Sequence, residues 1–489
     1  MLRDVEWDNI INEAHPQIAF DNFLQIFNEL YELIFPLQKS RINKNIHRIE
    51  KFMTDGLLKC RIKKFALSSL SIKEPTPENI SKYHKYRNIY TRAIKTAKKI
   101  YFSNELANCK TDLRKTWGTI REAMRKTKDK SSCIDELKYN NQIYVNKPDI
   151  SSKMNEHFSS VADKIASKIN PSPKDPCSYM PNYNSTFRMH SINSNIIKRI
   201  VSKMESKKST DIFGISNFLI KKIINGIALP LAHIINLSIS TGIVPNDMKI
   251  AKVIPIYKIK GNNSILKIDP SKYRPISLLP VFSKILEKIV YQQLMCYLNT
   301  NNIIYEHQYG FQSKKSTVHP VIHFLNYIAE AKNESKVAIG VFCDLEKCFD
   351  TISHSILIRK LSKIGIKGIE LEWFRNYLRD RKQFVSVNNV DSNKLGISRG
   401  VPQGSILGPI LFLIYINDLK NCTELFTLLF ADDSSFLISG KDFAQLKSKL
   451  NIELKKITDW FRCNEMSQNH TKLRLWPLTK KKIQLTLTL

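Results

Sequence analysis

The segment LLFADDSSFL, residues Leu428 to Leu437, places two adjacent carboxylates, Asp432 and Asp433, between two short apolar runs. Apolar runs of this length on either side of a polar centre are typical of two strands joined by a tight turn. Successive side chains on a strand point to opposite faces, so adjacent aspartates cannot both enter one core. Asp and Ser are also common turn residues, and taken alone the segment indicates only a solvated hairpin turn.

The overall composition indicates a large globular chain with a polyanionic partner. Its 489 residues are enough for about three domains, and a hydrophobic content of 43% is ordinary for globular proteins. Lys and Arg number 76 against 44 Asp and Glu, which gives a formal net charge of +32. Such a charge favours nucleic acid as the partner first and an anionic membrane surface second.

The spacing of the cysteines, the N-terminal sequence and the length of the apolar runs argue against several classes of protein. Nine cysteines without a CxxC pair or a Cys/His cluster argue against a disulfide framework and against structural zinc. The N-terminus, MLRDVEWDNI, lacks a signal-peptide pattern. The longest apolar run, Ile406 to Ile416, is interrupted by Gly408 and Pro409 and is too short to span a bilayer. We therefore expect an intracellular protein, in the nucleus or the cytoplasm, with no membrane partner.

Three regions precede the segments that carry chemistry. Residues 1–128 are predicted to form a basic helical region, because apolar side chains recur at helical spacing among many Lys and Arg residues. Residues 129–195 are rich in Ser, Asn, Pro and Lys and are predicted to form a polar linker. Residues 196–248 have a helical pattern, and KIAKVIPIYK, Lys249 to Lys258, is typical of a strand.

Within the basic region, residues 79–128 interleave aromatic and basic side chains, as in Lys82, Tyr83, Lys85 and Tyr86. Basic groups neutralise phosphates, and aromatic faces can stack unpaired bases. Alternatively, the aromatic side chains form the buried stripe of an amphipathic helix and the basic ones its solvated face. Both interpretations can hold at once.

A further carboxylate follows an apolar run upstream of the hairpin. The run VAIGVFCD, Val337 to Asp344, is typical of a central strand buried on both faces, with Asp344 at its C-terminal end. Clustered carboxylates repel one another unless cations neutralise them, and Mg²⁺ prefers such oxygen ligands. Two such ions about 3.5–4 Å apart can stabilise the attacking and leaving oxygens in phosphoryl transfer.

A glycine- and proline-rich segment, SRGVPQGSILGPILFLIYINDL, Ser398 to Leu419, lies between these two acidic segments. Its glycines allow close backbone approach, and its prolines fix local dihedral angles. Gln403 is therefore a polar side chain in a stiff turn, suited to contact a ligand. The alternative is a rigid loop that leads into a buried helix.

Five segments in this order resemble the reverse transcriptases of non-LTR retrotransposons, with the jockey and CR1-like groups most similar. They are YRPISLLPVFSKILEKIV (273–290), QYGFQSKKST (308–317), VFCDLEKCFDTISH (341–354), RGVPQGSILGPILFLIYINDL (399–419) and LLFADDSSFL (428–437). The resemblance implies an α+β chain, in which residues 249–475 form the fingers and the palm of a right-hand polymerase with an antiparallel palm sheet. It also implies extension of a DNA primer with dNTPs on an RNA template, with two Mg²⁺ ions that Mn²⁺ could replace.

The resemblance also assigns roles to single residues. Asp344, Asp432 and Asp433 match the family's catalytic, metal-binding aspartates. The nucleotide-binding positions match a gate against the sugar 2′-OH, an arginine that grips the triphosphate, a residue beside the incoming nucleotide, and a lysine after the hairpin: Phe349, Arg274, Gln403 and Lys472 respectively. Asp350 and His354 also match family positions, and we expect both to be structural.

The sequence departs from the family at its ends. After Lys472 the resemblance stops, and residues 476–489 are predicted to be a divergent tail in place of a thumb. The endonuclease of such proteins has no counterpart upstream, so a separate endonuclease is expected as a partner in integration. Two alternatives follow: an inactive remnant that only binds nucleic acid, and an RNA-templated RNA polymerase, against which Phe349 argues.

Overall fold

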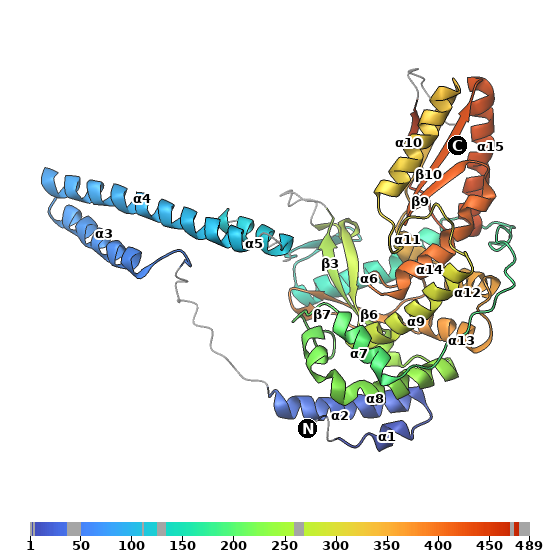
Figure 1. Ribbon diagram of the computed structural model, residues 1–489, viewed down its shortest axis with the longest axis horizontal. Coiled ribbons are helices and arrows are strands. Elements are labelled where there is room, and N and C mark those ends of the chain that lie inside the picture. Colours follow the sequence, from blue (N-terminus) through green and yellow to red (C-terminus); the bar gives the residue numbers. More distant parts are fainter. Residues whose placement is uncertain are drawn as a thin grey trace. The chain divides into compact units, whose positions relative to one another are not determined.

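The computed structural model describes residues 2, 5–36, 50–109, 112–124, 134–258, 268–469 and 474–478. The chain divides into two compact units, of which the first comprises Met1–Pro36 and Ile134–Leu489 and the second comprises Leu37–Cys133. The second unit contains the helices α3 (Asp55–Lys73), α4 (Pro77–Asn108) and α5 (Leu113–Ala123) (Figure 1). All sheets belong to the first unit.

A four-stranded antiparallel sheet carries the two acidic segments. Its strands are β5 (Val337–Cys343), β9 (Phe426–Phe430), β10 (Asp433–Gly440) and β11 (Arg474–Pro477), in the order β11-β5-β10-β9. The buried central strand and the hairpin are both confirmed, and Ala338, Ile339 and Val341 of β5 have no exposed surface. Two helices, α10 (Val318–Asn333) and α15 (Phe443–Cys463), lie alongside this sheet (Figure 1). The chain is therefore α+β, as predicted.

A second, five-stranded sheet is built around β3 (Ile250–Tyr257), which confirms the strand predicted from Lys249 to Lys258. Its order is β4-β3-β6-β7, with β8 also paired to β6; the other strands are β4 (Tyr273–Leu278), β6 (Lys382–Val387), β7 (Val390–Asp391) and β8 (Leu395–Gly396). β3 and β6 are parallel, and the remaining pairs are antiparallel. The sheet thus combines strands that precede the segment Val337 to Asp344 in the sequence with strands that follow it.

The structure differs from the polar linker predicted for residues 129–195. Within it lie a small hairpin, β1 (Leu137–Tyr139) with β2 (Gln142–Tyr144), and the helix α6 (Lys147–Ala166). Ile150, Met154 and Phe158 recur every four residues and form one buried cluster with Val385 and Val387 of β6. The high polar content hid this stripe, because one buried residue per helical turn suffices to attach a helix to a sheet.

The first 36 residues also differ from the prediction, which grouped them with the basic helices. They form α1 (Asp8–Ile11) and α2 (Pro16–Ile34) of the first unit. Phe20, Phe23 and Phe27 of α2 surround the ring of Phe282, edge to face, with ring centroids 5.2–6.1 Å away. Aromatic side chains contribute much of the burial in a core, so α2 is an integral part of this unit.

The remaining helices of the first unit pack between and beneath the two sheets (Figure 1). They are α7 (Ser194–Lys203), α8 (Asn217–Thr241), α9 (Val281–Thr300), α11 (Cys348–Thr351), α12 (His354–Lys363), α13 (Gly368–Leu378) and α14 (Leu407–Ile416), with short 3₁₀ turns at Asn246–Lys249, Pro270–Lys272 and Asn417–Cys422. In the described part of the chain, α8 is the one helix long and apolar enough to cross a membrane, and half of its most apolar stretch is buried in this unit. Core helices of globular proteins pass the same test.

Replacing Phe282 by alanine should destabilise the first unit by about 3–5 kcal/mol, the usual cost of emptying a buried phenylalanine site. Urea denaturation measures the change. The control is Phe35→Ala, because Phe35 is 54% exposed and its loss should change the free energy of unfolding by no more than about 0.5 kcal/mol. Equal effects in the two variants would contradict the attachment of α2 to this core.

Candidate active site

The turn between β9 and β10 presents the paired aspartates at one end of the four-stranded sheet. Asp432 is half-buried, and Asp433 is exposed and pairs with Phe430 at the start of β10. Ser434 lies opposite Cys343 of β5, so Asp344, the next residue, leaves β5 at the same end of the sheet. The three aspartates predicted from the sequence therefore lie at the same end of this sheet, although Asp344 precedes the other two by about ninety residues.

The three carboxylates are predicted to form one Mg²⁺ site together. Over the described residues, no three His, Cys, Asp or Glu side chains lie close enough to hold one metal ion. Mg²⁺ usually binds through one or two carboxylates together with substrate phosphates. The oxygen ligands present thus fit such an ion in their chemistry, and the phosphates of a bound nucleotide would complete its coordination.

Neighbouring side chains hold two of these carboxylates. Asn469 donates its backbone N–H to the carbonyl of Asp344 at 2.9 Å and its side-chain amide to the Asp344 carboxylate at 3.4 Å. Burial raises the pKa of the Cys348 thiol, and the adjacent Asp432 carboxylate raises it further, so the thiol stays protonated and donates to Asp432. Both contacts come from residues that the sequence did not single out.

A third segment holds the turn in place. Residues 307–309 run beside β9, where Tyr309 donates its N–H to the carbonyl of Leu429 at 2.8 Å. The side-chain oxygen of Gln308 accepts the N–H groups of Gly310 at 2.8 Å and Ala431 at 3.0 Å. Ala431 has a positive φ of 56°, a conformation that costs a non-glycine residue energy unless its surroundings fix it. Gln308 therefore stabilises the conformation of the turn that carries Asp432.

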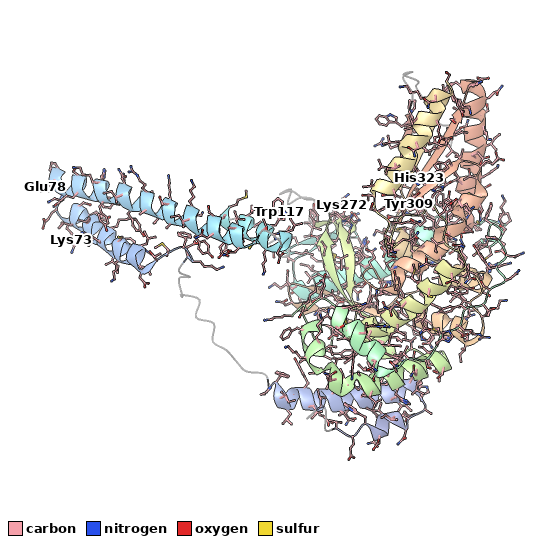
Figure 2. The ribbon with its side chains drawn as sticks, in the orientation of Figure 1. Lys73, Glu78, Trp117, Lys272, Tyr309 and His323 are labelled. Carbon is pink, nitrogen blue, oxygen red and sulfur yellow. The ribbon has the colours of Figure 1, made fainter. Side chains whose placement is uncertain are left out.

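Gly310 is required for this contact. A Cβ atom at Gly310 would lie 2.1 Å from the backbone nitrogen of Ala431, closer than any side chain can approach. The next helix along the chain is α10, and its residue His323 packs against Tyr309 with ring centroids 5.8 Å apart (Figure 2). The sequence placed this segment in a family block but gave no signal for its role, because the bond from Gln308 to Ala431 spans 123 residues.

The loop at Arg399–Gly404 lies against α11 and the start of α12. Gly400 donates its N–H to the carbonyl of Ile352 at 2.8 Å, and Val401 donates to the carbonyl of Phe349 at 2.9 Å. The ring of His354 lies 2.7 Å from the carbonyl oxygen of Gly400, to which its Nε2–H donates. His354 therefore has the orienting role expected of it.

Gln403 is held from two sides. Its side-chain amide N–H donates to the Asp350 carboxylate at 2.8 Å, and its backbone carbonyl accepts the backbone N–H of Ser277 of β4 at 2.7 Å. Burial raises the pKa of the Asp350 carboxyl, whereas the bond from Gln403 and the cations of Lys347 and Lys258 act to lower it. Asp350 thus has a structural contact, as expected. Because the NH₂ group of the Gln403 side chain donates to Asp350, the side-chain oxygen points away from it.

Gly404 makes the approach of the two segments possible. It has a φ of 119°, and an added Cβ would lie 2.6 Å from the carbonyl oxygen of Ser277. Only glycine combines that backbone conformation with so close a neighbour. Gly404 therefore allows its loop to approach the backbone of β4 closely, as expected of the glycines in this segment.

Phe349 lies half-buried between two other aromatic rings. It stacks on Phe412 of α14, with centroids 4.8 Å apart, and meets Phe311 edge to face at 5.8 Å. The ring therefore contacts both the buried Phe412 and the more exposed Phe311.

Arg274 and Lys472 are the other two predicted nucleotide-binding residues. Arg274 is exposed on β4, opposite Ile256 of β3, so its guanidinium group is accessible to an anion. Lys472 lies outside the described residues.

Residues 260–484 match the family described as reverse transcriptase (RNA-dependent DNA polymerase). Over these residues, just under half of its length, the chain is similar to reverse transcriptases. The matched region contains the segments of the candidate site from β4 to the hairpin of β9 and β10. The predicted resemblance is therefore confirmed at the level of the family.

Several proteins of mobile elements are similar to this region. The RNA-directed DNA polymerase from mobile element jockey of Drosophila melanogaster is 26% identical over 318 residues, which cover 62% of this chain and 34% of that protein. The probable RNA-directed DNA polymerase from transposon BS of the same species is 30% identical over 280 residues, 54% of this chain and 30% of that protein. The matched region thus spans about a third of the length of these curated relatives.

Gln308→Ala should lower the free energy of unfolding by about 1–3 kcal/mol, because it leaves the buried N–H groups of Gly310 and Ala431 without an acceptor. Thermal or urea denaturation measures this loss. Gln445→Ala is the matched control, since Gln445 is an exposed glutamine on α15. Equal stability of the two variants would show that Gln308 does not support the turn.

Proposed function

We propose that this chain is an RNA-directed DNA polymerase of a non-LTR retrotransposon, with the four-stranded sheet as its palm and the five-stranded sheet as part of its fingers. The observation that carries the proposal is the arrangement at one sheet end, where the turn with Asp432 and Asp433 adjoins the end of β5 with Asp344. The match of residues 260–484 to the reverse transcriptase family supports it. The substrates are then an RNA template, a DNA primer and dNTPs.

In the proposed reaction, the 3′-hydroxyl of the primer attacks the α-phosphate of a dNTP, and pyrophosphate leaves. The oxygens of Asp344, Asp432 and Asp433 would hold two Mg²⁺ ions, or Mn²⁺ in their place, which supply a lower pKa for the primer hydroxyl and charge neutralisation at the leaving oxygens. Gln308 and Asn469 keep two of the three carboxylates in position. Most of the acceleration in phosphoryl transfer comes from such positioning and from electrostatics.

The other residues act on the nucleotide. The exposed guanidinium group of Arg274 would bind the triphosphate, since charge-assisted hydrogen bonds to phosphate are strong. The edge of the Phe349 ring would clash with a 2′-hydroxyl group and so exclude ribonucleotides. Gln403, fixed by Asp350 and Ser277, would contact the nucleotide from the opposite loop.

A protein that binds nucleic acid without polymerisation is the second candidate. The observation that favours it is the formal net charge of +32, which attracts a polyanion whether or not a nucleotide is added. The two functions differ in a single measurable step, the addition of a nucleotide.

Primer extension on an RNA template with Mg²⁺ tests the proposal. The wild-type protein should incorporate dNTPs, and Asp432→Asn should reduce the rate at least about 1,000-fold, because it removes a charged ligand of the transition-state site. Asp442→Asn is the control: Asp442 caps α15 through Ala444, and Asn caps equally well, so its activity should equal that of the wild type. Tight RNA binding without any extension by the wild type would leave only the second candidate.

A further inference from the structure

One face of α4 carries a line of seven exposed side chains, four of which are basic; we call it the basic line. Lys82, Lys85, Ile89, Arg92, Thr96, Lys99 and Ser103 are separated by alternating steps of three and four residues, so they lie on one face of the helix. All are exposed, and the line contains no acidic residue. Lys82 pairs with Glu78 at 2.6 Å; in the described part of the chain, no ion pair is made by Lys85, Arg92 or Lys99.

Two tyrosines of α4 contact α3 instead. Tyr90 is buried and Tyr86 is half-buried, and the ammonium groups of Lys64 and Lys63 of α3 lie 5.6 Å from the ring centres of Tyr90 and Tyr86 respectively. The aromatic stripe is therefore used to attach α4 to α3. Of the two interpretations of this region, stacking of bases on these tyrosines loses its support, because the rings are already covered.

We propose that this basic line binds the phosphate backbone of a nucleic acid, without contact to the bases. The second unit as a whole has 25 Lys and Arg against 8 Asp and Glu between residues 37 and 133, so it attracts a polyanion. Phosphates occur on single and double strands alike, whereas stacking needs unpaired bases. Because the basic line itself contains no aromatic side chain, it should bind a duplex as well as a single strand.

The test removes four charges from the line: Lys82, Lys85, Arg92 and Lys99, each replaced by glutamine, which keeps helix propensity. A matched control replaces four exposed lysines of the first unit, Lys363, Lys367, Lys394 and Lys455, by glutamine. Fluorescence anisotropy measures Kd for a labelled DNA duplex and for its single strand over a range of salt concentrations. Binding requires no catalysis, so the result is independent of the proposed polymerase activity.

We expect the four-site variant to lose at least about tenfold in affinity for both ligands, and its plot of log affinity against log salt to become shallower by about 3, since each phosphate contact contributes about 0.7–0.9. The control should lose less than about threefold. An equal loss in both variants, or a loss confined to the single strand, would overturn the proposal.

A second inference concerns Phe311, which no sequence argument singled out. Phe311 is 46% exposed and has a positive φ of 55°, a conformation uncommon for a bulky residue. It follows Gly310, whose N–H is held by Gln308, and Gln312 donates its side-chain amide to the carbonyl of Gln308 at 2.5 Å. Phe311 is thus held next to the catalytic turn although its ring is not part of the core.

The ring of Phe311 meets that of Phe349 at 5.8 Å and 86°, while Phe412 supports the other face of Phe349. Resting on the proposed function, we infer that Phe311 is a positioning residue for sugar selection: it prevents the Phe349 ring from turning away from the 2′ position. The strained backbone of Phe311 agrees with this role, since strain persists where it serves function.

The test compares the ratio of kcat/KM for a dNTP to that for the matching rNTP. Phe311→Gly removes the ring and suits the positive φ, so the ratio should fall at least about tenfold without loss of thermal stability. Phe311→Tyr keeps the ring and should keep the ratio. Because Phe311 acts through Phe349, the double variant Phe311→Gly with Phe349→Ala should be no less selective than Phe349→Ala alone.

The outcomes of this test separate the role of Phe311 from the proposed polymerase activity. If Phe349→Ala relaxes selection but Phe311→Gly does not, the role of Phe311 is wrong and the polymerase proposal stands. Additive effects in the double variant would equally overturn it, because Phe311 would then act on the sugar directly. Absence of any extension by the wild-type protein overturns both.

Discussion

The hydrogen bonds of the buried Glu287 carboxylate hold together the helices at the centre of the region that matches reverse transcriptases. Glu287 has no exposed surface; it accepts the hydroxyl of Tyr377 at 2.9 Å and the N–H groups of Ile406 at 2.6 Å and Leu407 at 3.4 Å. Burial raises the pKa of this carboxyl, and Arg381 together with these hydrogen bonds opposes the rise. A buried charge is tolerated only when it is paired and hydrogen-bonded in this way. Glu287 thereby joins α9, α13 and the N-terminus of α14.

The position of α14 then fixes two parts of the proposed nucleotide site. The loop with Gln403 ends where α14 begins, and Phe412 of α14 supports the ring of Phe349. Every residue of α14 except Pro409 is buried, so the helix has no freedom to shift without disturbing the core. The Gln403 loop and the ring of Phe349 are therefore both positioned by this one buried helix.

Sequence reasoning recovered what is local and missed what is distant. The strands β3, β5, β9 and β10 were predictable because each is an apolar run bounded by turn residues, and the family blocks identified Asp344, Asp432 and Asp433. The bonds from Gln308 to Ala431 and from Asn469 to Asp344 connect residues 123 and 125 positions apart, and no local pattern reveals such pairs. α6 was missed for another reason: its few buried side chains are outnumbered by polar ones, and a mean over the segment hides their spacing.

The pairing of β11 with β5 has a consequence for the order in which this chain folds. Leu475 lies opposite Val341, so the outer strand of the sheet is synthesised long after the strand it covers. Until it arrives, β5 has an unpaired edge, and such edges promote association with other chains. Contacts between remote segments also slow folding, because loop closure precedes any gain in stability. The sheet that carries the aspartates is therefore completed late, and its exposed edge is the point at which nascent chains are most prone to aggregate.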